Sequence, residues 1–389
     1  MCIMNNSCRN AKQKMVWVTI AHHLLFFGVS FLLSSCGNGY KETTISVSPE
    51  KSTCNAHARI ESFIRLESND STLIGDITTL EFFQDRIYVF DKKVSKTLFV
   101  FDKAGKFLNK VKRGKGPGEI IEPWDFCINR DEKTILLWDQ MTFKLNTYDL
   151  NLSYLKSEIS PRLAIRNMTH LGGGDFLIFS QFYLVEGGEV IERELYDYLT
   201  YKDDFKALDR KLIKSNPKTR LVTLINPICK GEENYFIAPG DNHIYQLVDG
   251  GASQVLDFDF GKYQITDEDL DKGHRFYRRE IRKGNRVGPL SDLFINDDYA
   301  TVSFKYRGGS EFIIVDRITK KMISSFDLCS DNQLPVCRIK GLKEGNKFVG
   351  VVDALTFRNY ISSLEGEYGE LGSVDAFSNQ VLMNFVLEK

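Results

Sequence analysis

The amino-acid sequence predicts an all-β fold: a six-bladed β-propeller of four-stranded antiparallel blades with one helical insertion. The first observation is composition, because 28 Phe and 16 Tyr in 389 residues suit strands packed in layers. The second is a recurring pattern of short strand-like runs and turns. The third is the period of that pattern, marked by turn aspartates with gaps of 47, 54, 46 and 67 residues, namely Asp102, Asp149, Asp203, Asp249 and Asp316.

A repeating unit of about 45 residues is typical of a propeller blade. The clearest copy, RIYVFDKKVSKTLFVFDKAGKFLNKV, begins at Arg86 and has strand-like runs at 87–90 and 98–101 before the hairpin turn at Asp102. A second copy begins at Thr134, and weaker copies begin at positions 197, 234, 299 and 347. Six copies predict six blades, although the length also allows seven.

The long last gap is explained by a predicted helical insertion at residues 266–284, TDEDLDKGHRFYRREIRKG. Thr266 is a suitable N-cap, acidic residues fill the first turn, and Gly284 is suitable for the C-terminal end. A stripe at helical spacing would pack the insertion onto the propeller, and it consists of Leu270, His274, Tyr277 and Ile281. Without about 20 inserted residues, the gap returns to the common period.

A propeller has to close into a ring, and the two ends of the chain provide a means. Residues 57–68 form a strand-like segment that has no hairpin partner nearby. We predict that this segment pairs with residues 379–388 in the last blade and so leaves few exposed edges. The expected organisation is a signal peptide at 1–35, a flexible tether at 36–56 and a propeller at 57–389.

The N-terminal segment has the features of a secretion signal. Arg9, Lys12 and Lys14 precede an apolar stretch at 16–35. The sequence LSSC that ends at Cys36 resembles the bacterial lipobox, which implies cleavage before Cys36, acylation of that residue and stable attachment to the lipid bilayer. The glycine that follows resembles the pattern of lipoproteins sent to the outer membrane, where they face the periplasm or the outside. The alternative is a transmembrane span, because about 20 apolar residues can cross a bilayer.

Charge and cysteine content exclude several classes of function. With 51 basic and 52 acidic side chains, the chain has no electrostatic footprint for nucleic acid. No CxxC or DxDxDG motif is present, so neither a metal site nor a cofactor is expected. Cys329 and Cys337 could form a disulfide in an oxidising compartment, or they could be two small buried residues.

The glycine-rich stretch RGKGPGEI, residues 113–120, lacks the spacing of a phosphate-binding loop. Pro123 and the β-favouring residues around it also argue against a following helix. We interpret the stretch as the connection from the outer strand of one blade to the inner strand of the next. A sharper hypothesis is that its charged residues line a ligand surface, and these are Arg113, Lys115 and Glu119.

The order FDKAGKF, then GKGPGE and then PWDFCIN, at residues 101–129, resembles the six-bladed β-propeller lipoproteins of Bacteroidetes, which are known as domains of unknown function and are similar in layout to NHL-repeat propellers. The resemblance covers roughly residues 57–388, and GKGPGE is its most specific part. It implies a fold and a compartment. The family has no established catalytic residues to carry over.

No catalytic set is evident, and no catalytic residue is predicted. The histidines after the signal segment are scattered among different copies, and there is no GxSxG motif. A basic cluster in the insertion is more suggestive, because arginine side chains suit carboxylate, sulfate or phosphate. It consists of Arg275, Arg278, Arg279 and Arg282. The alternative is a solvated face that nearby acidic residues neutralise, namely Glu268, Asp269, Asp271 and Glu280.

These observations predict a non-catalytic lipoprotein, anchored to the outer membrane, whose propeller binds a glycan, a peptide or an envelope protein. The alternative is a carbohydrate-active lyase or hydrolase at the channel mouth, which would need clustered His, Glu, Asp or Tyr side chains and a perturbed carboxylate. A sensor domain that feeds a kinase is a third class, disfavoured because the chain ends after the propeller. Fold alone does not choose between binding and catalysis.

Overall fold

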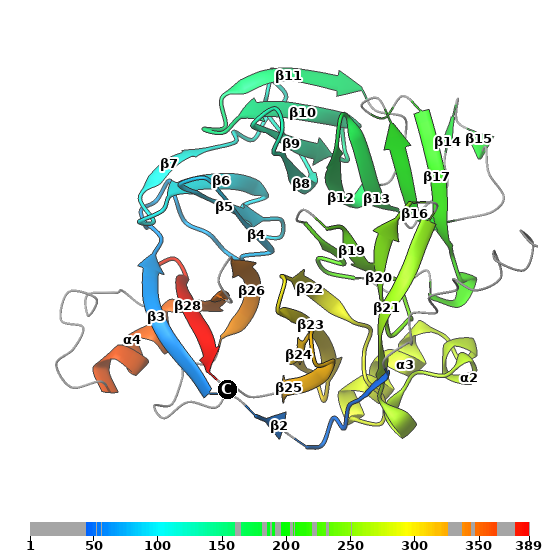
Figure 1. Ribbon diagram of the computed structural model, residues 1–389. Coiled ribbons are helices and arrows are strands. Elements are labelled where there is room, and N and C mark those ends of the chain that lie inside the picture. The colour runs from blue at the N-terminus through cyan, green and yellow to red at the C-terminus, as the bar shows by residue number, and fades with distance from the viewer. Residues whose placement is uncertain are drawn as a thin grey trace, which may run out of the picture. The chain divides into compact units, whose positions relative to one another are not determined.

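Six antiparallel sheets surround a central axis and form a six-bladed β-propeller (Figure 1), which confirms the predicted fold class. The computed structural model describes residues 44–51, 53–55, 57–159, 165–180, 185–186, 189–190, 196–202, 205, 207–219, 224–230, 233–249, 251–325, 337–343, 347–363 and 378–388. Residues 43–389 form one compact unit. The predicted signal peptide and Cys36 lie outside the described residues.

The first three blades follow one another along the chain, each from its inner to its outer strand. Blade 1 contains β4 (Thr79–Phe83), β5 (Arg86–Asp91), β6 (Thr97–Asp102) and β7 (Phe107–Lys110). Blade 2 contains β8 (Pro123–Asn129), β9 (Thr134–Asp139), β10 (Lys144–Asp149) and β11 (Tyr154–Ile159). Blade 3 contains β12 (Ile165–Gly172), β13 (Asp175–Ser180), β16 (Tyr196–Lys202) and β17 (Ala207–Lys214), and a small hairpin of β14 (Val185–Glu186) and β15 (Glu189–Val190) interrupts it.

The last three blades complete the ring, and a 3-10 helix, η1 (Pro217–Thr219), precedes them. Blade 4 contains β18 (Ile228–Cys229), β19 (Tyr235–Ile237), β20 (His243–Val248) and β21 (Gly251–Asp259). Blade 5 contains β22 (Ser291–Ile295), β23 (Tyr299–Tyr306), β24 (Gly309–Asp316) and β25 (Lys321–Ser325). Blade 6 contains β26 (Arg338–Lys343), β27 (Lys347–Val352) and β28 (Val381–Glu388), with β3 (His57–Arg65) as its outer strand.

The ring closes as the sequence predicts, with the N-terminal strand β3 beside the C-terminal strand β28. The two strands pair antiparallel from His57 opposite Glu388 to Arg65 opposite Val381. Blade 1 is hydrogen-bonded to the segment that follows the closing strand, because the N–H of Glu67 donates to Gly105 O at 2.8 Å. Both termini of the propeller are therefore held in one sheet, and its last blade has no missing strand.

Part of the predicted flexible tether is ordered against the propeller. The strand β1 (Thr44–Ser46) pairs parallel with β21, and β2 (Thr53–Cys54) pairs antiparallel with β25. Each adds a fifth strand to its blade. The backbone of β1 gains partners on the open edge of β21, which explains why a polar segment without a hairpin signal becomes a strand.

The predicted helical insertion is present, but it is divided. It contains α2 (Asp267–Asp271) and α3 (His274–Lys283), and a 3-10 helix, η2 (Gly261–Tyr263), precedes it. Thr266 caps α2 in a capping box, and Gly284 ends α3 with a φ of 78°, as predicted. The break falls at Gly273, whose φ of 85° no helix adopts. A further helix, α4 (Ala354–Ser363), joins β27 to β28 and was not predicted.

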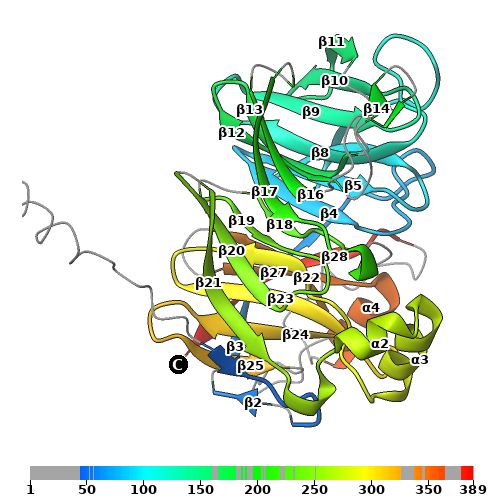
Figure 2. The ribbon, with the colours of Figure 1, turned by 90° about the vertical axis from the view of Figure 1, so that its right-hand side faces the viewer.

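The helices α2, α3 and α4 project from the same face of the ring (Figure 2), which we call the helix face. This arrangement follows from topology. The first two helices lie in the connection from an outer strand to the next inner strand, and α4 lies in a connection between the second and third strands of a blade. Both kinds of connection leave an antiparallel blade at the same end. Among the described residues, no helix is both long and apolar enough to cross a bilayer.

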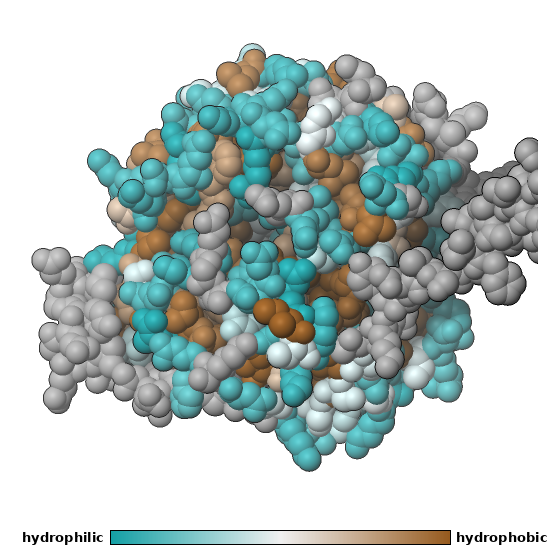
Figure 3. Space-filling view, in the orientation of Figure 1, coloured by the Kyte–Doolittle hydropathy of each residue, from teal (hydrophilic) through white to brown (hydrophobic). Residues whose placement is uncertain are grey.

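Hydrophobic side chains from neighbouring blades interlock and form the core. Phe90 of blade 1 and Phe126 of blade 2, for example, meet edge to face with ring centroids 5.9 Å apart. Trp138 is fully buried in a cluster shared by blades 2 and 3. In the orientation of Figure 1, the surface carries hydrophobic residues in separate patches among hydrophilic ones (Figure 3). The driving force is therefore the burial of the sheet faces between blades.

Candidate functional site

The predicted turn aspartates have a structural role. Asp102 Oδ1 accepts hydrogen bonds from the N–H groups of Ala104 and Lys106, and Asp149 repeats the arrangement in blade 2. Asp249 and Asp316 likewise lie in or beside the turn between the third and fourth strands of their blades, whereas Asp203 is outside the described residues. The carboxylates of Asp102, Asp149 and Asp316 accept backbone N–H groups at hairpin turns, as their residue type favours.

The inner strands of the six blades all begin on the helix face, so the residues before them surround one mouth of the central channel. The turn at residues 92–96 between β5 and β6 lies at this mouth too. Loops held on a rigid scaffold are where binding groups most often lie. A ligand-binding site is therefore expected among the polar side chains at this mouth.

A buried ion-pair cluster crosses the channel. Lys230 Nζ lies 3.1 Å from Asp125 Oδ1 and 3.3 Å from Glu81 Oε1, and the three side chains are 9%, 1% and 10% exposed. The N–H of Met168 donates to the other oxygen of Asp125 at 2.8 Å. The cluster thus joins side chains or backbone of blades 1, 2 and 3 to the residue that follows β18.

Electrostatics keep this lysine charged. Burial alone would lower the pKa of Lys230, but the carboxylates of Asp125 and Glu81 more than offset burial and raise it. Burial raises the pKa of Glu81, against the attraction of Lys230. A lysine held in this way is a structural cation, because its charge is already compensated inside the protein.

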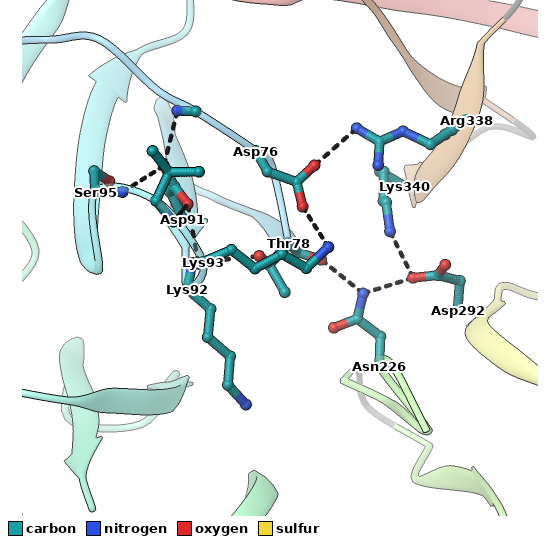
Figure 4. A network of polar contacts seen from close by, with 12 residues as sticks. Asp76, Thr78, Asp91, Lys92, Lys93, Ser95, Asn226, Asp292, Arg338 and Lys340 are labelled. Carbon is teal, nitrogen blue, oxygen red and sulfur yellow. Dashed lines mark hydrogen bonds and ion pairs between the residues drawn. The ribbon is translucent and has the colours of Figure 1, made fainter. Parts of the chain in front are cut away.

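A second polar network lies nearer the helix face (Figure 4). Asp76 Oδ2 lies 2.7 Å from Lys93 Nζ. Asp292 Oδ1 lies 2.7 Å from Lys340 Nζ and accepts a hydrogen bond from Asn226 Nδ2, also at 2.7 Å. Asp76 Oδ1 also lies 3.1 Å from Arg338 Nη2 of blade 6. Carboxylates therefore neutralise these cations around the mouth, and the contacts tie blades 1, 5 and 6 together.

A cavity of about 400 Å³ opens beside these networks, and we call it the mouth pocket. This volume falls in the range of small-molecule sites, about 300–1,000 Å³. Its floor and rim combine amide, hydroxyl, cationic and aromatic groups. The lining residues are Thr78, Thr79, Lys92, Lys93, Lys96, Glu122, Trp124, Asp125, Asn167, Leu224, Ile225 and Asn226.

Two cations lie over one indole ring at this pocket. Lys92 Nζ is 4.2 Å and the guanidinium carbon of Arg166 is 4.1 Å from the ring centroid of Trp124. Such cation–π contacts are worth about 0.5–2 kcal/mol, depending on desolvation. The aromatic ring therefore holds positive charge at the pocket without neutralising it.

Lys92 differs from the other amino groups of the mouth. Among the described residues, its ammonium has no ion-pair or hydrogen-bond partner, and in Figure 4 its amino end points away from the Asp76 network. Burial lowers the pKa of Lys92 to about 8, although Asp125 attracts the charge from a longer distance. The cations around it that do have a carboxylate partner are Lys93, Lys96, Lys230, Arg338 and Lys340.

The opposite end of the channel has a cavity of about 330 Å³. Glu81, Arg130, Asp131 and His170 are among the residues that line it. A carboxyl with a raised pKa that lines the same cavity as a histidine is a combination that the enzymatic alternative requires. Most of the Glu81 side chain is nevertheless enclosed beside Lys230, which limits its access to a substrate.

The loop RGKGPGEI is the predicted connection, between β7 and β8. Glu119 folds back within it, and its carboxylate accepts the N–H of Gly116 at 2.8 Å. Gly118 has a φ of 71°, and a Cβ there would lie 2.5 Å from Tyr154. Arg113 and Lys115 are exposed, and neither belongs to the mouth pocket. The glycines serve backbone geometry, as we expected, and a ligand role for the charged residues stays a prediction.

The arginines of the insertion lie on α3, which packs through Tyr277 and Ile281. Arg275 and Arg282 are exposed, and among the described residues neither has an ion-pair partner. Arg279 pairs with Glu280 at 3.1 Å. The structure does not bring these residues together with Arg113, Lys115 and Glu119, because α3 joins blades 4 and 5 and the loop joins blades 1 and 2.

The described part of the chain contains no cluster of three His, Cys, Asp or Glu residues that could hold a metal ion. Cys337 is a free thiol, as are the buried Cys127 and Cys229. Cys329 lies outside the described residues. Burial raises the pKa of the Cys337 thiol to about 12, so this group is an unreactive side chain.

Sequence reasoning missed the two residues that distinguish the mouth pocket, Lys92 and Trp124. The signal for Lys92 was its place directly after Asp91, in the turn that the repeat pattern puts at the end of a strand. Trp124 was quoted in the motif PWDFCIN without a role. Neither residue stands out in the sequence. The two side chains meet only because the propeller places blade 1 beside blade 2.

Comparison with known proteins places the chain in a family. A family model described as "Domain of unknown function (DUF4934)" matches residues 58–385. No curated protein matches. One similar solved structure, named provisionally as an exported protein of Bacteroides fragilis, has a TM-score of 0.72 at 17% identity and covers 89% of this chain and 99% of its own.

A second solved structure, a member of the DUF4221 family from Bacteroides vulgatus, has a TM-score of 0.54 at 8% identity. It covers 87% of this chain and 99% of its own. At such identities the likeness shows the fold alone. The family match is of a different kind, because it spans nearly all of the propeller, and the chain therefore belongs to the family of domain of unknown function DUF4934.

Proposed function

We propose that this protein is an outer-membrane lipoprotein whose propeller binds an acidic glycan, without catalysis, at the mouth pocket. The observation that carries the proposal is the ammonium of Lys92, which is held over Trp124 in a cavity of about 400 Å³ with no carboxylate partner among the described residues. A ligand carboxylate would supply the missing charge. The gain is a charge-assisted hydrogen bond in a partly desolvated site.

The other groups of the pocket suit a sugar. Asn167 lines the pocket with an amide group and Trp124 with an aromatic ring, whereas the Thr79 hydroxyl and the Asn226 amide are hydrogen-bonded to each other. Pockets that combine a few polar groups with aromatic surface are typical of small-molecule sites. A uronic acid, which has a carboxylate next to several hydroxyls, matches this combination better than a neutral sugar does.

Location supports a role in the cell envelope. The solved structure with a TM-score of 0.72 is named as an exported protein, and the lipobox-like sequence before Cys36 provides a means of attachment.

Intrinsic fluorescence provides a direct test. The chain has three tryptophans, of which Trp17 precedes Cys36 and Trp138 is fully buried, so Trp124 reports on the pocket. We expect saturable quenching by digalacturonic acid and none by the neutral galactose disaccharide. Lys92→Met should weaken binding about 10- to 100-fold, because a charged hydrogen bond is worth about 1.5–3 kcal/mol.

The matched control is Lys93→Met, which removes the neighbouring amino group that already pairs with Asp76. It should leave the affinity within about threefold. If digalacturonic acid fails to bind, or if both variants lose affinity equally, the assignment of the pocket is wrong. A Trp138→Phe background assigns the fluorescence change to Trp124.

Glu81 favours one second candidate, a lyase or hydrolase at the opposite mouth. Its carboxyl combines burial, a raised pKa and a place beside the cavity that His170 also lines. The test is product formation from acidic and neutral oligosaccharides by the wild type and by Glu81→Gln. Activity in the wild type that the variant lacks would favour the enzyme, and its absence from both would leave the binding proposal.

A further inference from the structure

The helix α3 carries a stripe of positive charge on the same face of the ring as the mouth pocket. Arg275, Arg278 and Arg282 are three and four residues apart, so their Cα atoms fall within a sector of about 60° and span about 10 Å along the helix. All three side chains are exposed. We call these three residues the arginine stripe.

Three acidic residues of the insertion are paired with cations outside the arginine stripe. Glu268 pairs with Lys272 at 2.7 Å, and Asp271 pairs with Lys218 at 2.7 Å. Asp269 binds Arg286 at 2.5 Å and also accepts from the N-cap Thr266. The neutralisation that the sequence allowed is therefore absent for the arginine stripe within the described residues.

Of the other two acidic residues, Asp267 has no ion-pair partner among the described residues, and Glu280 is occupied. Its carboxylate lies 3.1 Å from Arg279 Nε and 4.0 Å from Lys283 Nζ, and it accepts from Asn285 at 2.7 Å. The helix is fixed to the propeller on its other side, where Tyr277 and Ile281 are buried. The arginine stripe is thus an uncompensated cationic surface on a rigid support.

We propose that the arginine stripe is a second contact for the same ligand, so that the ligand is an acidic polysaccharide that extends from the mouth pocket across the helix face to α3. This inference rests on the proposed function, because it assigns the length and charge of the ligand of that site. Guanidinium groups match carboxylate and sulfate in a planar, bidentate manner. A repeated acidic sugar would place such groups along its whole length.

Shared location is the reason for choosing a polysaccharide over a membrane surface. The residues that line the pocket and those of α3 both lie at connections on the helix face. An extended polymer can occupy a pocket and an exposed helix on one face at the same time, whereas a flat bilayer does not enter a pocket.

The test is the dependence of affinity on ligand length. We would titrate the chain from Gly37 onward, whose propeller closes on itself and forms one compact unit, with digalacturonic acid and with long polygalacturonic acid. The wild type should bind the polymer at least tenfold more tightly per chain, since two linked contacts act at high effective concentration. The advantage should shrink with added salt, because the stripe is exposed.

The informative variant reverses the stripe, Arg275→Glu, Arg278→Glu and Arg282→Glu together. It should bind digalacturonic acid as the wild type does and lose the tenfold advantage of the polymer. Replacing the same three residues with Gln separates loss of charge from repulsion, and its thermal unfolding checks that the fold is intact. The control reverses three exposed cations of blade 1 and the loop after it, namely Lys103, Lys106 and Lys112.

The outcomes are distinguishable. If digalacturonic acid does not bind, the proposed function itself is wrong. If digalacturonic acid binds but the polymer binds no more tightly, the second contact alone is overturned. The same holds if the reversed variant keeps the tighter binding of the polymer. Sedimentation of the same chain with vesicles that contain anionic lipid, lost in the reversed variant, would assign the arginine stripe to the membrane instead and would also overturn the inference.

Discussion

Replacing Lys92 with Met should stabilise the free protein at neutral pH while it weakens ligand binding. Burial lowers the pKa of Lys92 from its usual value of 10.5 to about 8. Each pKa unit corresponds to about 1.4 kcal/mol, so a fall of this size means that holding the charge costs at most about 3–4 kcal/mol. The side chain keeps partial contact with solvent, and its contact with Trp124 returns about 0.5–1 kcal/mol. We therefore expect a gain of about 1–2 kcal/mol.

The pH dependence of this gain has a definite sign. Below about pH 8 the lysine is protonated in both the folded and the unfolded states, so the cost of burying the charge is fully present. Between about 8 and 10.5 the folded protein releases the proton first, and the wild type becomes more stable as the pH rises. The advantage of Lys92→Met should therefore be largest near pH 7 and vanish near pH 10.5.

The assay is urea unfolding followed by circular dichroism, with the free energy of unfolding extrapolated to water at pH 7 and pH 10. Lys93→Met serves as the control, since its amino group is largely exposed and pairs with Asp76. Its effect should stay within about 0.5–1 kcal/mol, the usual worth of an exposed ion pair. A Lys92→Met protein that is less stable at pH 7, or whose gain persists unchanged at pH 10, would refute the reasoning.

Three further predictions concern structure and attachment. Lys230→Met should lower the free energy of unfolding by about 3–5 kcal/mol in urea titrations, because it leaves Asp125 and Glu81 buried without their cation; a loss below 1 kcal/mol would contradict this. Gly118→Ala should reduce the thermal midpoint by more than Gly173→Ala does, since both glycines have positive φ but only Gly118 faces a ring at 2.5 Å; equal shifts would argue against the packing role. Cys36→Ser should move the protein from the membrane fraction to the soluble fraction and remove acyl mass from the intact protein; unchanged partition with residues 1–35 retained would indicate a transmembrane span.

The sequence allowed the architecture to be predicted because each blade repeats local signals. The hairpin aspartates mark the same turn in successive blades, and Thr266 and Gly284 mark the ends of the insertion. Closure by β3 was predictable as well, since a strand without a local partner must pair elsewhere. The helix α4 was missed because its sequence, ALTFRNYISS, is rich in β-branched and aromatic residues, and its connection between two strands decides its conformation.

The candidate site was less predictable, for a physical reason. Cation–π contacts and ion pairs at a channel mouth join residues from different blades, such as Lys92 and Trp124. Which residues meet depends on how the blades are arranged around the propeller axis. Sequence spacing drew attention to RGKGPGEI instead, where the structure shows glycines required by a turn and a carboxylate bound to its own loop. The arginines of α3 were recognised from helical spacing, but which acids neutralise their neighbours was visible only in the folded insertion.

The most direct test of the binding proposal is the titration of the Lys92 ammonium by heteronuclear NMR, in the free protein and in protein saturated with digalacturonic acid. We predict a pKa near 8 in the free protein, because burial disfavours the charge. The bound carboxylate should raise that pKa by at least one unit. A pKa that does not move when the ligand saturates the protein would contradict the claim that Lys92 holds an acidic ligand in the mouth pocket.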